Sequence, residues 1–127
     1  NPSCLPDNPM KRIYYLSTCD TCTRILRMID TEGVEMVNIR EQNISKEDLQ
    51  YMRKKTGSYE ALFNKRAQKL REMAPNKKPA TDLDYKKLIL KDYTFLKRPA
   101  AILDGQVIAG NDDKAVATLV RLLPKNT

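Results

Sequence analysis

The fold class follows from residues 13–22, which run Ile-Tyr-Tyr-Leu-Ser-Thr-Cys-Asp-Thr-Cys. The segment from Ile13 to Leu16 combines apolar, aromatic and β-branched side chains, which is typical of a buried strand. Cys19 and Cys22 follow at once and form a C-x-x-C pair where the strand gives way to a helical pattern. The sequence therefore predicts a strand, a cysteine-bearing turn and a helix in direct succession.

The helical pattern begins at Cys19, and Gly33 is placed to end it. We expect a helix of about a dozen residues because apolar side chains recur at the i, i+3, i+4 and i+7 positions, namely Cys22, Ile25, Leu26 and Ile29. Val34–Ile39 predicts a second strand. Strand, helix and strand in this order form a βαβ unit with parallel strands and a right-handed crossover.

The middle of the chain, over about residues 45–93, is predicted to be a helical insert. Ser45 with Asp48, and Thr81 with Asp84, are patterns typical of helix N-termini. Between these two helices a broken helical stripe is expected from the apolar positions Tyr59, Leu62, Phe63, Ala67 and Leu70.

The C-terminal part predicts a hairpin and a last helix. Asp104-Gly105 is a two-residue turn signal between the strand-like segments 100–103 and 106–109. Gly110-Asn111-Asp112 is expected to cap a helix that Pro124 ends. The order is β-α-β, helical insert, β-β-α, and a C-x-x-C inside a βαβ unit is typical of thioredoxin-like proteins. We therefore predict an α/β, thioredoxin-like fold with a four-stranded mixed sheet.

The chain has 127 residues, a length that suits a single domain. Residues 1–9 hold three prolines and no periodicity, so we interpret them as a disordered leader, either an upstream segment or a remnant, with Cys4 as a bystander. The domain is then residues 10–124. No apolar run approaches the ~20 residues that span a bilayer, and three cysteines do not make a disulfide framework, so a reducing cytoplasm is expected.

Composition excludes several kinds of chemistry. The chain has no histidine, which rules out Ser-His-Asp and Cys-His pairs and histidine-containing zinc sites. Its 23 Lys and Arg against 16 Asp and Glu give a net charge of +7. We interpret this charge as a solvated basic surface and expect no direct nucleic-acid partner and no membrane partner.

Cys19 and Cys22 are the main candidates for chemistry. A thiol at a helix N-terminus faces unpaired N–H groups and the positive end of the helix dipole, which favour the thiolate. Cys19 is nearer that end and is expected to attack, while Cys22, one turn on, is more shielded and resolves. Three alternatives remain: core packing of both thiols, a zinc site for which four ligands are not in view, and Cys22 as a passenger beside a working Cys19.

Two arginines are candidates for binding an anion. Arg98 lies beside Pro99 before the third strand, and Arg66 lies in Asn64-Lys65-Arg66. A planar guanidinium offers paired donors to the oxygens of an oxyanion. A positive charge near a thiol also favours its thiolate.

From about Met10 to Leu123 the chain resembles the arsenate-reductase-like branch of the thioredoxin superfamily, which includes bacterial glutaredoxin-linked arsenate reductases and the Spx redox regulators. The resemblance rests on the Cys19 loop and on three further segments: Phe63-Asn64-Lys65-Arg66, Leu96-Lys97-Arg98-Pro99 and Gly110-Asn111-Asp112.

The resemblance implies a role for each matching residue. Cys19 matches the nucleophile of the reductases and the sensing thiol of the regulators; Arg66 and Arg98 match two oxyanion-binding arginines, and Pro99 matches a cis proline. Asn64 and the cysteine-loop residues Thr18, Asp20 and Thr21 are expected beside the substrate. No bound cofactor or metal is implied; the reductant would be glutathione, glutaredoxin or thioredoxin.

The chain departs from the reductases in three ways. Cys22 is the second cysteine of the regulators, a third oxyanion arginine around residues 108–112 is absent, and a histidine near the nucleophile is absent. We favour a thiol oxidoreductase acting on a small oxyanion or a disulfide. The alternative is an Spx-like regulator that binds the RNA polymerase α subunit, with Cys19–Cys22 as a redox-active disulfide and Gly57 near the contact.

Overall fold

The computed structural model describes residues 11–125, so the predicted leader with Cys4 lies outside the described residues. Its elements follow one another in the predicted order β-α-β, helical insert, β-β-α. With η for a short 3₁₀ helix, they are β1 (Lys11–Tyr15), α1 (Asp20–Leu26), β2 (Glu35–Asn38), α2 (Lys46–Thr56), η1 (Glu60–Leu62), α3 (Gln68–Glu72), η2 (Pro75–Lys77), α4 (Asp82–Lys91), η3 (Tyr93–Phe95), β3 (Ala100–Leu103), β4 (Gln106–Ala109) and α5 (Asp113–Leu122).

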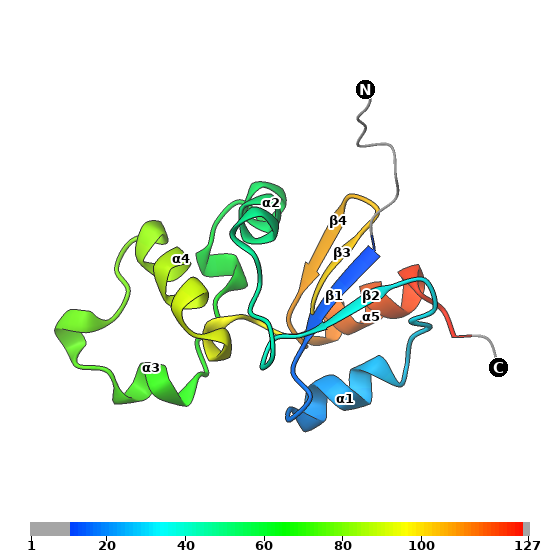
Figure 1. Cartoon of the computed structure of the whole chain (residues 1–127), viewed down its shortest axis with the longest axis horizontal. Helices are drawn as coiled ribbons and strands as arrows, with labels where there is room; N and C mark the ends of the chain where they lie inside the picture. Colours follow the sequence, from blue (N-terminus) through cyan, green and yellow to red (C-terminus); the bar gives the residue numbers. More distant parts are fainter. Residues whose placement is uncertain (1–10, 126–127) are drawn as a thin grey trace.

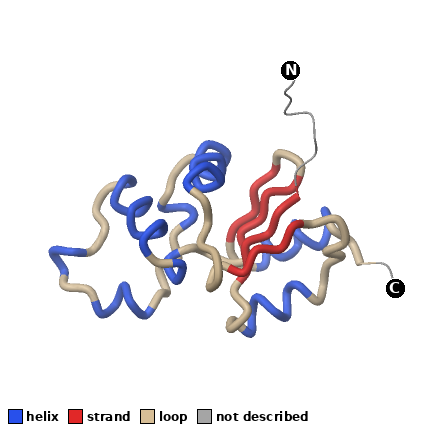
Figure 2. Tube along the Cα trace, in the orientation of Figure 1, coloured by secondary structure: helices blue, strands red, loops and turns tan. Residues whose placement is uncertain are grey.

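The four strands form one mixed sheet in the order β2-β1-β3-β4 (Figure 2). The first two strands are parallel, with Ile13 opposite Met36, and β3 runs antiparallel to both β1 and β4. The β3–β4 turn is Asp104-Gly105, with both residues at positive φ, as the hairpin signal predicts. The predicted α/β class and four-stranded mixed sheet are confirmed.

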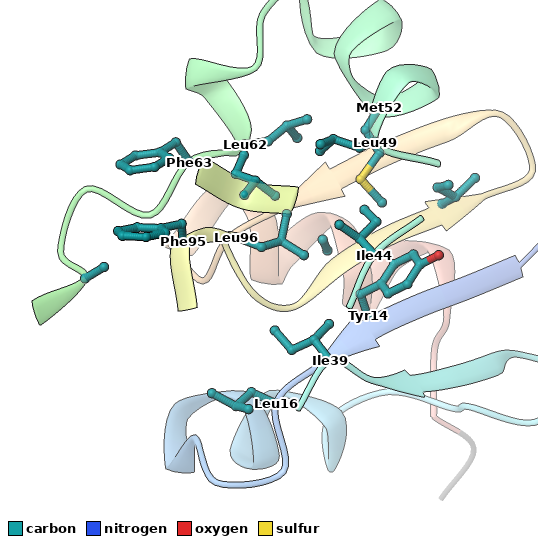
Figure 3. Packing of buried hydrophobic residues seen from close by; sticks show 14 residues of the cluster. Tyr14, Leu16, Ile39, Ile44, Leu49, Met52, Leu62, Phe63, Phe95 and Leu96 are labelled. Atoms are coloured by element: carbon teal, nitrogen blue, oxygen red, sulfur yellow. The ribbon is translucent and has the colours of Figure 1, made fainter. Parts of the chain in front are cut away.

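Alternation along the strands divides the core into two layers. Ile13 packs on one face with α1 and α5, while its neighbour Tyr14 packs on the other face with α2. Figure 1 shows α1 and α5 together on one side of the sheet and the insert extending away from the other. The insert-side layer holds Leu49 and Met52 of α2 together with Phe63 (Figure 3).

The predicted first helix is too long. α1 has seven residues, with Cys19 as its N-cap rather than its first residue. It ends early because Ile29 leaves helical geometry to form a bridge with Pro124, next to a hydrogen bond from the Asp30 N–H to the Leu123 carbonyl. Gly33 lies instead at positive φ in the turn before β2.

The predicted helix starts in the insert are confirmed. Ser45 caps α2 by accepting from the Asp48 N–H, and Thr81 and Asp84 form a reciprocal capping box on α4. Gly57 ends α2 in the left-handed conformation. The predicted stripe over 59–70 is two short helices, η1 and α3, with an extended break between them.

A buried polar cluster joins β1 to α2. Asp48 is buried and accepts hydrogen bonds from the Tyr14 hydroxyl and the Arg12 guanidinium, and Arg12 also pairs with Glu35. Burial, with the neighbouring Asp48 carboxylate, raises the pKa of Tyr14. The phenol therefore remains a hydrogen-bond donor to Asp48 throughout the neutral range.

Candidate functional site

A pocket of about 730 Å³ lies where the cysteine turn meets the insert. We call it the cysteine pocket. The polar lining residues with a chemical role come from four separate loops: Cys19, Asn64, Arg66, Lys97, Arg98 and Asn111. The structure therefore brings together four residues that the sequence predicts for the site, from positions up to 79 residues apart.

Two of these loops are held together by a β-bridge between Phe63 and Leu96. The Asn64 N–H donates to the Phe95 carbonyl at 2.7 Å, and the Lys97 N–H donates to the Leu62 carbonyl at 2.8 Å. Beneath the bridge the Phe63 and Phe95 rings are stacked, with centroids 5.2 Å apart (Figure 3). This pairing breaks the expected helix and positions both arginine-bearing loops at the pocket.

Asn64 shapes the loop that carries Arg66. Its side-chain oxygen accepts the Arg66 N–H at 3.1 Å, a local turn that competes with a helix, and its amide reaches the Thr94 carbonyl at 3.4 Å. The Arg66 side chain is exposed at the pocket. Asn64 thus acts as a positioning residue for this arginine.

Arg98 is held by main-chain acceptors but keeps one donor free. Its Nη1 donates to the carbonyls of Thr94 and Leu96 at 3.1 and 3.3 Å. Among residues 11–125, its Nε is the one buried side-chain nitrogen or oxygen without a hydrogen-bond partner. A buried donor left unpaired costs about 1–3 kcal/mol, and the residue that carries it lines the cysteine pocket.

The two cysteines occupy different environments. Cys19 is half-buried and lines the pocket, whereas Cys22 is fully buried one turn further along; both are free thiols. Burial raises the pKa of the Cys22 thiol, while a hydrogen bond with the Leu16 backbone and the Arg98 charge oppose this rise. Cys22 is therefore protonated at neutral pH and lies within the electrostatic range of Arg98.

The remaining predicted residues do not line the cysteine pocket. Thr18 and Asp20 are exposed, Thr21 is half-buried, and Pro99 is buried behind Arg98 in a cis peptide bond, as the resemblance implied.

Lys97 and Asn111 line the pocket although neither is predicted as a site residue from the sequence. Both lie in segments that carried the family resemblance, so their position in the chain was a signal. Their residue types were not, because a lysine before a strand and an asparagine in a turn are ordinary surface residues.

The sequence matches no family model and no curated protein. Solved structures do match. A YffB protein is 21% identical with a TM-score of 0.73, covering 87% of this chain and 98% of its own. An arsenate reductase from Vibrio cholerae is 15% identical with a TM-score of 0.69, and the match covers 92% of this chain and 100% of that protein. A protein from Brucella melitensis related to arsenate reductase is 18% identical with a TM-score of 0.64, and the match covers 96% of this chain and 100% of that protein.

The chain has the arsenate-reductase-like fold. This agrees with the predicted α/β, thioredoxin-like fold class and with the resemblance to arsenate-reductase-like proteins. Among the described residues, no helix is long and apolar enough to cross a membrane. The same residues hold no cluster of three or more Cys, Asp or Glu side chains placed to bind a metal ion.

Within this arsenate-reductase-like fold, the region around residues 108–112 carries no arginine, but a cation lies beside it. The Lys97 side chain passes Gly110, where a Cβ would come 3.6 Å from the Lys97 Cδ. Lys97 makes no ion pair among residues 11–125, in contrast to Lys65, which pairs with Glu60 at the same pocket. The pocket thus combines one thiol with Arg66, Lys97 and Arg98, an arrangement suited to holding an anion beside a sulfur nucleophile.

Proposed function

We propose that the protein is a cytoplasmic thiol oxidoreductase of the arsenate-reductase type, with Cys19 as nucleophile and Cys22 as resolving thiol. The observation that carries the proposal is that Cys19 shares one pocket with Arg98, whose buried Nε has no partner. Arg66 supplies a second guanidinium at the same pocket. These residues can bind an oxyanion and present a sulfur to it.

With arsenate as substrate, the Cys19 thiolate attacks arsenic, an S–As bond forms, and one arsenate oxygen leaves as water after protonation. Arg66 and Arg98 hold the other oxygens and stabilise the charge on them. Cys22, once deprotonated, attacks the Cys19 sulfur; the S–S bond forms, and the S–As electron pair passes to arsenic. Two thiols are oxidised to a disulfide, and arsenic(V) is reduced to arsenic(III).

The same pair would act on a mixed disulfide. Cys19 attacks the disulfide of a glutathionylated molecule, one thiol leaves, and Cys22 then releases the second product by the same exchange. In both cases the Cys19–Cys22 disulfide is reduced again by glutathione, glutaredoxin or thioredoxin.

Alkylation of Cys19 tests the proposal. Iodoacetamide is applied at neutral pH with and without arsenate, and peptide mapping separates Cys19 from Cys4 and Cys22. Arsenate should slow the alkylation of Cys19 in the wild type, and Arg98→Ala should abolish this protection. Arg40→Ala, an exposed arginine that does not line the pocket, is the control. Absence of protection in folded wild-type protein would contradict the proposal.

The second candidate is a redox-dependent regulator that binds the RNA polymerase α subunit. The observation that favours it is the exposed end of α2, where Gly57 at a φ of 101° leaves open space for a partner. The test is a binding assay with the C-terminal domain of that subunit, using reduced and oxidised protein. Binding in one redox state supports the regulator, and binding in neither excludes it.

A further inference from the structure

A second hollow, of about 560 Å³, lies between α1 and α5. We call it the α1–α5 groove. Its floor is apolar, and the residues that form the floor come from both helices: Ile25, Met28, Val116, Ala117 and Val120.

The groove results from the amphipathic pattern of α5. Leu119 and Leu123 are buried against the sheet, whereas Val116 and Val120, on the flank that faces α1, remain half-buried. α1 is too short to cover them, and Met28 follows its end with 46% of its surface exposed. Met28 and Leu83 are the two exposed large hydrophobic side chains of residues 11–125, and Met28 lines the α1–α5 groove.

The charges at the rim indicate the kind of partner. Arg24 and Arg121 line the groove, and neither makes an ion pair among the described residues. Asp113 is the single acidic residue that lines it. An apolar floor between two free guanidinium groups suits an apolar side chain flanked by carboxylates.

The groove adjoins the cysteine pocket at one residue. Asn111 lines both hollows, and α1 carries Cys19 at its start and Arg24 in its last turn. A protein held in the groove would therefore have its own reactive group next to Cys19.

We propose that the α1–α5 groove is the docking surface for the dithiol protein that reduces the oxidised Cys19–Cys22 pair. This rests on the proposed function. The partner places an apolar side chain against Met28 and carboxylates opposite Arg24 and Arg121. Its thiolate attacks the Cys19 sulfur, and Cys22 leaves as a thiolate that takes up a proton. The partner's second thiolate then attacks the mixed disulfide, which releases Cys19 and leaves the partner as a disulfide.

The test compares protein and small-molecule reductants on the oxidised protein. Thioredoxin and glutaredoxin are used in turn, and dithiothreitol serves as the reference. Met28→Glu should lower the second-order rate about tenfold with at least one protein reductant, and Arg121→Glu should lower it about threefold. Neither change should affect reduction by dithiothreitol. The matched control is Leu83→Glu, which should behave like the wild type with every reductant.

Several outcomes would overturn the docking proposal. Unchanged rates with both protein reductants would exclude the groove, and equal slowing of dithiothreitol would show a local distortion instead. If sedimentation shows a dimer that Met28→Glu dissociates while the reduction rates stay constant, the groove joins two copies of this chain. If the wild type forms no Cys19–Cys22 disulfide, the proposed function itself fails, and the docking proposal fails with it.

Discussion

The insert between β2 and β3 and the rest of the chain differ in charge. Residues 39–99 hold 16 Lys and Arg against eight Asp and Glu, whereas the remaining residues hold seven against eight. The insert thus carries a net charge of +8 and the remainder −1. The positive net charge of the whole chain therefore comes from one structural region.

The cysteine pocket lies at the border between these two regions. Its thiol comes from the nearly neutral region, at the junction of β1 and α1, while Arg66, Lys97 and Arg98 come from the basic one. Under the proposed function, reactivity and anion binding are therefore supplied by different parts of the molecule. Substitutions in one region or the other separate the two contributions.

The largest effect is expected from removing the thiol. Cys19→Ser should reduce thiol-dependent turnover to background, because a serine hydroxyl is not ionised at neutral pH and is a poor nucleophile. It should still bind arsenate, since the cations of the insert remain; calorimetric titration measures this. Cys22→Ser is the matched variant and should keep alkylation of Cys19 while losing the internal disulfide. Loss of anion binding in Cys19→Ser would contradict the separation.

A large loss of stability is expected when the connection between the regions is weakened. Phe63 is fully buried between Phe95 and Tyr85, so Phe63→Ala should lower the free energy of unfolding by about 3–5 kcal/mol. Urea unfolding measures this. Arsenate protection of Cys19 should weaken in the same variant, because the Phe63–Leu96 bridge positions both arginine-bearing loops.

Leu119→Ala is the control for this variant. Leu119 is equally buried, but on the α1–α5 side of the sheet. The substitution should cost about 2–5 kcal/mol and leave arsenate protection unchanged under conditions where the protein is folded. Equal loss of protection in both variants would show that the effect follows from stability alone.

Much of this architecture could be predicted from local signals. The Asp104-Gly105 turn and the Ser45 and Thr81 caps are encoded by neighbouring residues, and they agree with the structure. The predicted length of α1 was wrong because the end of this helix depends on a bridge between Ile29 and Pro124, which are distant in sequence. The break after Phe63 depends in the same way on Leu96. Pairings of this kind leave no periodic pattern.

A smaller effect is expected at Lys97. Lys97→Gln should raise the arsenate concentration for half-protection of Cys19 about three- to tenfold, or about 0.7–1.4 kcal/mol, because one of the pocket cations is lost. Lys97→Arg should restore most of the affinity. Lys87→Gln, at an exposed lysine on α4 away from the pocket, should have no effect. An unchanged midpoint in Lys97→Gln would show that the lysine does not reach the anion.

A pH-dependent effect is expected from the Tyr14–Asp48 contact, the second connection between the regions. Because the folded pKa of Tyr14 is raised, the unfolded chain releases the phenol proton at lower pH than the folded protein does, and stability falls as pH rises through about 10. Tyr14→Phe should be less stable at pH 8 by about 1 kcal/mol. It should then lose less stability than the wild type between pH 8 and 10.5, measured by urea unfolding.

The site was only partly predictable. Cys19, Arg66 and Arg98 could be identified because a C-x-x-C turn and family-like segments mark them. Lys97 and Asn111 could not, since their presence at the pocket depends on how loops from β3, β4 and η1 meet. Thr18 and Asp20, which the resemblance places beside the substrate, are exposed and do not line the cysteine pocket.

The Phe63–Leu96 bridge also affects what the intervening chain can tolerate. It closes residues 64–95 into a loop whose ends are fixed, and the entropy of closing such a loop grows only with the logarithm of its length, about 0.6 kcal/mol for each doubling. Pro75–Lys77, the exposed η2 turn, lies near the middle of this loop. Inserting a short tag there should change the free energy of unfolding very little and leave the arginines in place. The η2 turn is therefore a suitable position for length variation and for a label.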